Sequence, residues 1–249
     1  MASPVHQFEV HPLVPIQIDG IDVSFTNSAL FMAFAVAFSY AFLTLGMRER
    51  SLVPGRWQSM AELVYEFIAG MIRDNVGKEG ARYFPFIFSL FMFVTVGNFL
   101  GMMPYSFTFT SHLVVTGALA LTVFIGVTII GFSRHGLHFL RLFFPHGAPI
   151  ATAPILIPIE MISYLSRPFS LGVRLFANMT VGHIMLKVLA GFVVAFIVKL
   201  GFFGGVVTGI VPMAAVVGVT ILEFGIAFLQ AYVFTILSCI YLNDAINMH

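Results

Sequence analysis

Charged side chains are scarce in this sequence, and their scarcity decides its class. They make up 9% of the residues, whereas apolar residues make up 59% and the mean hydropathy is +0.99. Soluble domains contain roughly 25% charged residues, so the composition indicates an integral membrane protein. A length of 249 residues suits one domain with about five or six spans of about 20 residues each. The net charge of +1 gives no reason to expect a nucleic-acid partner.

Residues for disulfide, metal or nucleotide chemistry are equally few. Cys239 is the only cysteine, so no disulfide forms within the chain, and the 8 His residues show no metal-site spacing. The one Gly-Lys pair, Gly77 and Lys78, is followed by Glu79, where a phosphate-binding loop needs Ser or Thr. We therefore expect neither a metal nor another cofactor.

Lys and Arg are absent from residues 1–25, which contain acidic residues and prolines instead. A secretory signal peptide needs a basic start followed by an apolar run, so we predict an extended external tail over residues 1–26. Basic residues gather at 47–82 and 133–147, and the positive-inside rule places such segments in the cytoplasm. We thus expect the N-terminus outside and the C-terminus in the cytoplasm.

Long apolar runs predict an all-α polytopic membrane protein that forms a single domain. The predicted spans are 28–46, 84–103 and 112–132, followed by two longer helices at 158–199 and 213–247. Residues 54–78 place apolar side chains at three- and four-residue spacing, which predicts an amphipathic helix. That helix either lies in the membrane surface or packs on the protein's own spans, and the sequence leaves both open.

The two last helices are too long to stand upright in a bilayer. About 40 helical residues extend roughly 60 Å, twice the roughly 30 Å hydrocarbon core. A break near Pro168 is one solution, but the polar stripe described next continues through it in register, which favours a strongly tilted helix. The Gly-rich segment 201–209 has Gly at four-residue spacing, which suits a close-packing helix face, but beside Pro212 we predict instead the turn of an antiparallel hairpin.

A polar stripe runs along the predicted helix 158–199. Its central members recur every seven residues, so they drift by only about 20° per step at about 100° per residue. The Arg174 stripe, as we call it, comprises Glu160, Ser163, Arg167, Ser170, Arg174 and Asn178. An ionisable group at membrane depth costs roughly 2.5 to 3.5 kcal/mol and must face protein or water. Arg174 stays protonated and is therefore a functional hypothesis by default.

A second polar stripe lies on the last predicted helix, where Glu223 and Gln230 are seven residues apart and Tyr241 lies near the same line. A lone Glu in a membrane can simply be protonated, and a lone Gln is often a structural hydrogen bond. Two stripes around one Arg favour a functional role over these alternatives. Asn98, in an earlier span, is expected to form a helix-to-helix hydrogen bond rather than to line a proton path.

Two segments, SRPFSLGVRLFANMTVGH and ILEFGIAFLQAYVFTILSCIYL, resemble subunit a of the F-type ATP synthase. The resemblance extends over roughly residues 26–249. It implies a subunit that is not catalytic by itself and that conducts protons beside a rotating ring of c subunits. It also implies b-type peripheral stalk subunits, membrane lipid and, indirectly, the catalytic head as partners. A bacterial inner membrane is then expected, with the mitochondrial inner membrane less favoured.

The resemblance also implies roles for single residues. Arg174 matches the essential arginine, Asn178 its neighbouring asparagine and Gln230 the glutamine opposite. Glu160 and Arg167 match the acidic and basic residues upstream. His183 and Glu223 match an acid and imidazole pair whose order is reversed here, as in mitochondrial and related bacterial members, and we expect the two to be in contact.

The spacing along the helix suits two offset half-channels. At 1.5 Å per residue, Glu160 lies about 21 Å to the cytoplasmic side of Arg174 and His183 about 13 Å to the outer side. We expect an outer half-channel through His183, Glu223 and Gln230 and an inner one near Glu160. A ring carboxyl would lose its proton beside the Arg174 cation, and the imidazole favours protons over sodium. A secondary transporter would show internal repeats, which the sequence lacks, and a structural scaffold would not need a charged Arg174.

Overall fold

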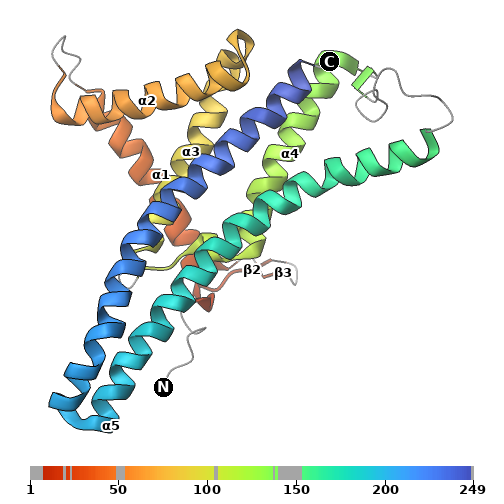
Figure 1. Ribbon diagram of the computed structural model, residues 1–249. Helices are drawn as coiled ribbons and strands as arrows, with labels where there is room; N and C mark the ends of the chain where they lie inside the picture. The colour runs from red at the N-terminus through yellow and green to blue at the C-terminus, as the bar shows by residue number, and fades with distance from the viewer. Residues whose placement is uncertain are drawn as a thin grey trace. The chain divides into compact units, whose positions relative to one another are not determined.

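A computed structural model describes residues 8–18, 21–22, 24–48, 54–103, 106–136, 138–139 and 153–247. Residues 1–7 of the predicted tail, and residues 140–147 of the second basic segment, lie outside these ranges. The helices are α1 (Asn27–Gly46), α2 (Arg56–Asn75), η2 (Lys78–Tyr83), α3 (Phe84–Gly101), η3 (Phe109–Ser111), α4 (Leu113–His135) and α5 (Ala153–Ile246) (Figure 1). Five helical stretches in the described part are long and apolar enough to cross a membrane. The predicted all-α membrane fold is confirmed.

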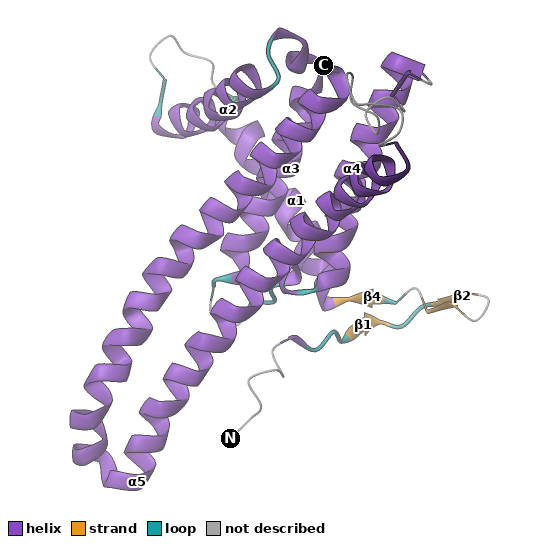
Figure 2. Cartoon of the chain, turned by 45° about the vertical axis from the view of Figure 1, so that its right-hand side comes forward, coloured by secondary structure: helices purple, strands orange, loops and turns teal. Residues whose placement is uncertain are grey.

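The described part of the N-terminal tail is folded back on itself. Strand β1 (Pro12–Val14) pairs antiparallel with β4 (Phe25–Thr26), and β2 (Gln17–Ile18) pairs with β3 (Ile21–Asp22) (Figure 2). The side chain of Asn27, the first residue of α1, binds the backbone of the tail. Its Oδ1 accepts a hydrogen bond from the His11 N–H at 3.2 Å, and its Nδ2 donates one to the Glu9 carbonyl at 3.1 Å. The tail thus enters α1 through paired strands.

The chain divides into two compact units, which are described separately. Unit one contains Met1–Tyr40, Phe93–His112 and Leu175–Ala231, and unit two contains Ala41–Met92, Leu113–Arg174 and Tyr232–His249. Unit one holds the tail, most of α1, the second half of α3, η3 and the middle of α5. Unit two holds the end of α1, α2, η2, the first half of α3, all of α4 and the two ends of α5.

Helix α5 is a hairpin of two arms, Pro154–Gly201 and Phe203–Ile246, with 48 and 44 residues. The arms run antiparallel from their turn (Figure 1), and a Cβ built on Gly209 would lie 3.5 Å from Val193 Cγ1. The predicted hairpin is confirmed, and its reversal falls at the first residue of the predicted turn segment 201–209, whereas residues 203–209 are helical. The reversal is made at Gly201, whose φ of 73° is accessible to glycine at little steric cost.

Prolines inside α5 neither break it nor set the turn. Pro168 and Pro212 both lie within helix, and Gly201 is the one described residue of α5 with non-helical dihedral angles. The second arm therefore begins ten residues before the predicted start at 213, and the first begins before 158. Membrane helices tolerate proline because neighbouring helices and local adjustments satisfy the carbonyl that proline leaves without a donor.

Helix α2 is amphipathic and has two sets of apolar side chains, one buried and one exposed. Its buried residues, Ala61, Ile68, Met71 and Ile72, pack within unit two. A separate set is open to the surroundings, with exposed fractions of 66% for Trp57 and 68% for Leu63. One face of α2 therefore packs on the protein, and the exposed face suits lipid, so contact with the membrane surface stays a prediction.

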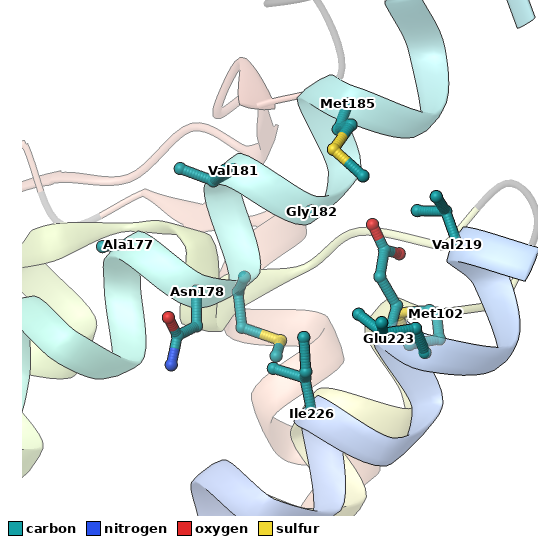
Figure 3. A pocket seen from close by; sticks show the side chains of 11 residues that line it. Met102, Ala177, Asn178, Val181, Gly182, Met185, Val219, Glu223 and Ile226 are labelled. Carbon is teal, nitrogen blue, oxygen red and sulfur yellow. The ribbon is translucent and has the colours of Figure 1, made fainter. Parts of the chain in front are cut away.

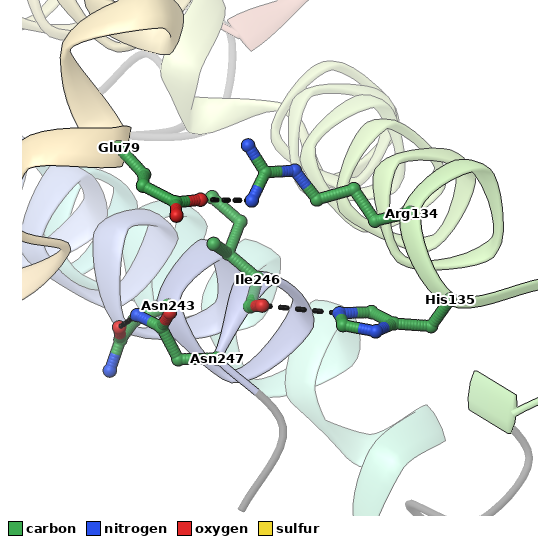
Figure 4. A network of polar contacts seen from close by, with 6 residues as sticks. All are labelled: Glu79, Arg134, His135, Asn243, Ile246 and Asn247. Atoms are coloured by element: carbon green, nitrogen blue, oxygen red, sulfur yellow. Dashed lines mark hydrogen bonds and ion pairs between the residues drawn. The ribbon is translucent and has the colours of Figure 1, made fainter.

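Polar contacts fix the ends of several helices in unit two (Figure 4). Arg134 at the end of α4 forms an ion pair with Glu79 of η2. His135 donates a hydrogen bond from Nε2 to the Ile246 carbonyl at 3.1 Å, at the last residue of α5. The C-terminal end of α4 is thereby held to both η2 and the end of α5.

Candidate functional site

Arg174 is exposed on the first arm of α5. Within the described ranges, its guanidinium makes no hydrogen bond or ion pair with another residue. Along the same stripe Ser163 and Ser170 are exposed and Glu160 is half-buried. The structure therefore leaves the cation of Arg174 available to a group outside this chain.

Arg167 has a different environment from Arg174. Its Nη1 donates to Asp244 Oδ2 at 2.8 Å, and its guanidinium carbon lies 5.6 Å from the ring centroid of Tyr164 and 5.2 Å from that of Tyr241. A cation at such distances from aromatic faces gains cation–π stabilisation. Arg167 thus ties the first arm to the second within unit two, and this arrangement points to a structural role.

In unit one the two polar stripes meet through an amide pair. Asn178 Nδ2 donates a hydrogen bond to Gln230 Oε1 at 2.7 Å, and Gln230 is only 1% exposed. Asn98, which is fully buried, donates from Nδ2 to the Ala227 carbonyl at 3.1 Å. Asn98 therefore makes the expected helix-to-helix hydrogen bond, to the backbone of the second arm beside Gln230.

A cavity of about 250 Å³ in unit one contains Glu223 (Figure 3). The Glu223 side chain is 5% exposed, and neither carboxyl oxygen has a hydrogen-bond partner among the described residues. The lining residues are Met102, Ala177, Asn178, Met179, Val181, Gly182, Met185, Val219, Leu222, Glu223 and Ile226. The walls are mostly apolar, so the carboxyl oxygens are the main unsatisfied polar groups of the cavity.

Gly182 makes room for the carboxyl group across the hairpin. A Cβ built on Gly182 would lie 2.6 Å from Glu223 Oε1 and 2.9 Å from Glu223 Cδ, which is closer than non-bonded carbon and oxygen atoms approach. The sequence alone does not single out Gly182, because its importance depends on which residue of the second arm faces it.

His183 is held by the segment that precedes α4. Its Nε2 and Thr108 Oγ1 are hydrogen-bonded at 3.1 Å, and Thr180 Oγ1 donates to the Ser111 carbonyl at 3.2 Å. The Phe8 ring lies edge-on, with its centroid 6.4 Å from that of the imidazole. No hydrogen bond joins His183 to Glu223 in the described part of the chain, so the expected pair is not hydrogen-bonded, and Thr108 takes the place of the carboxyl.

Comparison with known proteins finds full-length relatives. The family model described as ATP synthase A chain matches residues 29–243. ATP synthase subunit a of Rhodospirillum rubrum is 68% identical over 249 residues, which is 100% of both chains. The subunit a of Paramagnetospirillum magneticum is 67% identical over 252 residues, again covering 100% of both. That of Parvibaculum lavamentivorans is 56% identical over 245 residues, which cover 98% of this chain and 94% of the relative.

Proposed function

Because the chain belongs to the ATP synthase A chain family, which supplies the membrane proton-translocating subunit of that complex, we propose that two offset half-channels in it pass protons to and from a rotating ring of c subunits. Arg174 is the fixed cation between them. The observation that carries this proposal is that Arg174 is exposed and makes no hydrogen bond or ion pair with another described residue, in an arm that is long and apolar enough to cross a membrane.

An exposed Arg174 can act electrostatically on a carboxyl group of another subunit. In surroundings of low dielectric constant its charge stabilises a nearby ionised carboxylate far more than in water. A ring carboxyl that comes opposite Arg174 therefore releases its proton, and it is protonated again after it has passed. The same positive charge repels a proton that would otherwise cross directly. Each proton that descends the membrane potential supplies about 2.3 kcal/mol per 100 mV, which biases the direction of rotation.

The outer half-channel in this proposal uses the cavity of unit one. Glu223 is buried there with two oxygens that no described residue satisfies, and a cavity of about 250 Å³ has room for several waters of about 30 Å³ each. Water donating to Glu223 would satisfy these oxygens and supply a proton relay. His183, bonded to Thr108, stands one residue beyond Gly182 and serves as the neighbouring proton carrier.

The inner half-channel begins at Glu160, which is half-buried and lies about 21 Å along the helix from Arg174. Ser163 and Ser170 lie between the two and are exposed. Neither half-channel crosses the membrane alone, so protons must travel on the ring.

The subunit conducts protons without itself catalysing ATP synthesis, and its other partners are the b-type stalk subunits and, indirectly, the catalytic head.

The orientation follows from the basic segments of the chain. The protein lies in a bacterial inner membrane with its N-terminus outside and its C-terminus in the cytoplasm, because the described basic residues of α2, η2 and the end of α4 belong to the cytoplasmic side under the positive-inside rule. Glu160 then opens towards the cytoplasm, and the Glu223 cavity opens towards the outside.

Thiol accessibility tests both the half-channels and their orientation. Cys239 is fully buried, and Cys239→Ala removes it to give the background. Ser163→Cys, on the Arg174 stripe, and Met185→Cys, which lines the cavity, are then introduced separately into the complete ATP synthase. A membrane-impermeant thiol reagent should label Ser163→Cys only in inverted vesicles and Met185→Cys only in right-side-out vesicles.

The matched control for this labelling is Ile162→Cys, beside Ser163 but off the polar stripe. Ile162 is 69% exposed in the isolated chain, and in the complex it should face lipid and resist the reagent from both sides. Labelling of both stripe positions from the same face, or equal labelling of Ile162→Cys and Ser163→Cys, would refute the half-channel proposal.

A further inference from the structure

A second cavity lies in unit two, away from the proposed proton path. The end of α2, η2 and the start of α3 enclose about 620 Å³. The lining residues are Tyr65, Ala69, Ile72, Arg73, Gly77, Lys78, Ala81, Phe84 and Pro85. None of them belongs to the Arg174 stripe or to the Glu223 cavity, so the cavity needs a separate explanation.

The walls of this cavity combine two cations with an apolar and aromatic surface. Arg73 and Lys78 are charged, and no lining residue is acidic. Neither cation forms an ion pair with another residue in the ranges that the structure describes. The neighbouring carboxylate of Glu79 is paired with Arg134, which leaves the positive charge of Lys78 without that counter-ion.

The apolar part of the cavity is built from ring and aliphatic groups. The rings of Tyr65 and Phe84 lie 4.6 Å apart between centroids at an interplanar angle of 50°, and Ile72 is only 2% exposed. A free phosphate ion would gain nothing from such a surface, whereas an acyl chain or glycerol backbone would bury apolar area against it.

The position of the cavity matches the boundary of a membrane span. The apolar stretch Lys78–Gly101 begins with one of the two cations, and basic residues at span ends reach the headgroup region. Gly77 has a φ of 80°, which lets the chain turn between α2 and η2, so that Arg73 and Lys78 line one cavity. A Cβ on Gly80 would lie 2.7 Å from Ile72 Cγ2, so η2 is packed closely on α2.

We propose that this cavity binds one anionic phospholipid, with its phosphate between Arg73 and Lys78 and its apolar part against Tyr65 and Phe84. The arrangement combines charge recognition of the phosphate with burial of the lipid stem. Zwitterionic lipid places an ammonium beside the two cations and is disfavoured. The site stands independently of the proton path.

The test uses the complete, purified ATP synthase after delipidation, titrated with phosphatidylglycerol and examined by native mass spectrometry. The variant Arg73→Gln/Lys78→Gln removes both cations and should lose one tightly held phosphatidylglycerol. Each Lys or Arg near an anionic lipid contributes about a fivefold gain in binding, so the loss of two weakens this site about 30-fold. The subunit masses in the same spectra verify assembly.

The matched control is Arg48→Gln/Arg56→Gln, which removes the same charge from exposed positions before and at the start of α2. It should retain the native lipid count. Equal phosphatidylglycerol binding by native and Arg73→Gln/Lys78→Gln complexes would overturn the proposal, as would equal affinity for phosphatidylcholine. Displacement of the lipid by millimolar inorganic phosphate would show a free-phosphate site instead and would also overturn it.

Discussion

Substituting Gly182 by Ala tests whether the position of the Glu223 carboxyl matters. The new Cβ would lie 2.6 Å from Glu223 Oε1, whereas ordinary van der Waals contact begins at 3.4 Å. The carboxyl must therefore move by about 0.8 Å to relieve the overlap. It is the end of a flexible side chain, so the move is made by torsion of the Glu223 side chain at a stability cost of about 1 kcal/mol.

A small loss of stability should accompany a large loss of proton transport. A displacement of about 1 Å in a reacting group can reduce a rate about 100-fold, so Gly182→Ala should slow ATP-driven proton pumping by about 10- to 100-fold. The assay is acidification of inverted membrane vesicles, normalised to the amount of assembled complex.

Gly191→Ala is the control for this experiment, because a Cβ there meets nothing within 4 Å. Both substitutions raise helix propensity equally on the same arm, so they differ mainly in the contact with Glu223. Equal pumping by the two variants, per assembled complex, would refute the importance assigned to the carboxyl position.

Three further substitutions test other contacts of the hairpin. Thr108→Val removes the hydrogen bonds of Oγ1 to His183 and to the Gly101 carbonyl, each worth about 1 kcal/mol, and should shift the pH dependence of pumping while assembly is retained. Gly201→Ala places a side chain at a φ of 73° and should lower the thermal stability of the purified complex by about 1 to 2 kcal/mol. In a double-mutant cycle, Arg167→Gln and Asp244→Asn should show a coupling energy of about 1 kcal/mol in thermal unfolding, because the pair is partly exposed.

Each of these tests has a matched control within the chain. Thr122→Val removes a hydroxyl that bonds the carbonyl of Ala118 in its own helix and should leave the pH profile unchanged. Gly191→Ala, at a helical and open position, should not lower stability. For the ion pair, additive effects of the two single substitutions would show that no coupling exists.

The helices followed from the sequence because apolar length and periodicity are local properties. The turn of α5 is shorter than the segment 201–209 that clustered glycine and Pro212 indicate, because among the described residues of α5 only Gly201 has non-helical dihedral angles. Pro212 suggested a helix start, yet the second arm continues on both sides of it. Backbone dihedral angles at a single residue leave no periodic signal in the sequence.

The site was predictable only in part, for a related reason. The stripe positions of Asn178 and Gln230 followed from helical spacing, and the structure joins their amides. The partners Thr108 and Asp244 depend on contacts between segments far apart in the chain, which spacing does not reveal. The resemblance suggested that His183 and Glu223 touch, whereas the imidazole is bonded to Thr108.

The central claim is that the Arg174 cation couples proton flow to rotation. ATP-driven proton uptake in inverted vesicles, measured for Arg174→Gln with co-purification of the ring and catalytic head as a check of assembly, tests it most directly. Lys199→Gln, at an exposed position on the same arm, removes the same charge as a control. We expect that the Arg174→Gln complex assembles but does not pump, while the Lys199→Gln complex pumps normally. Normal pumping by an assembled Arg174→Gln complex would contradict this claim.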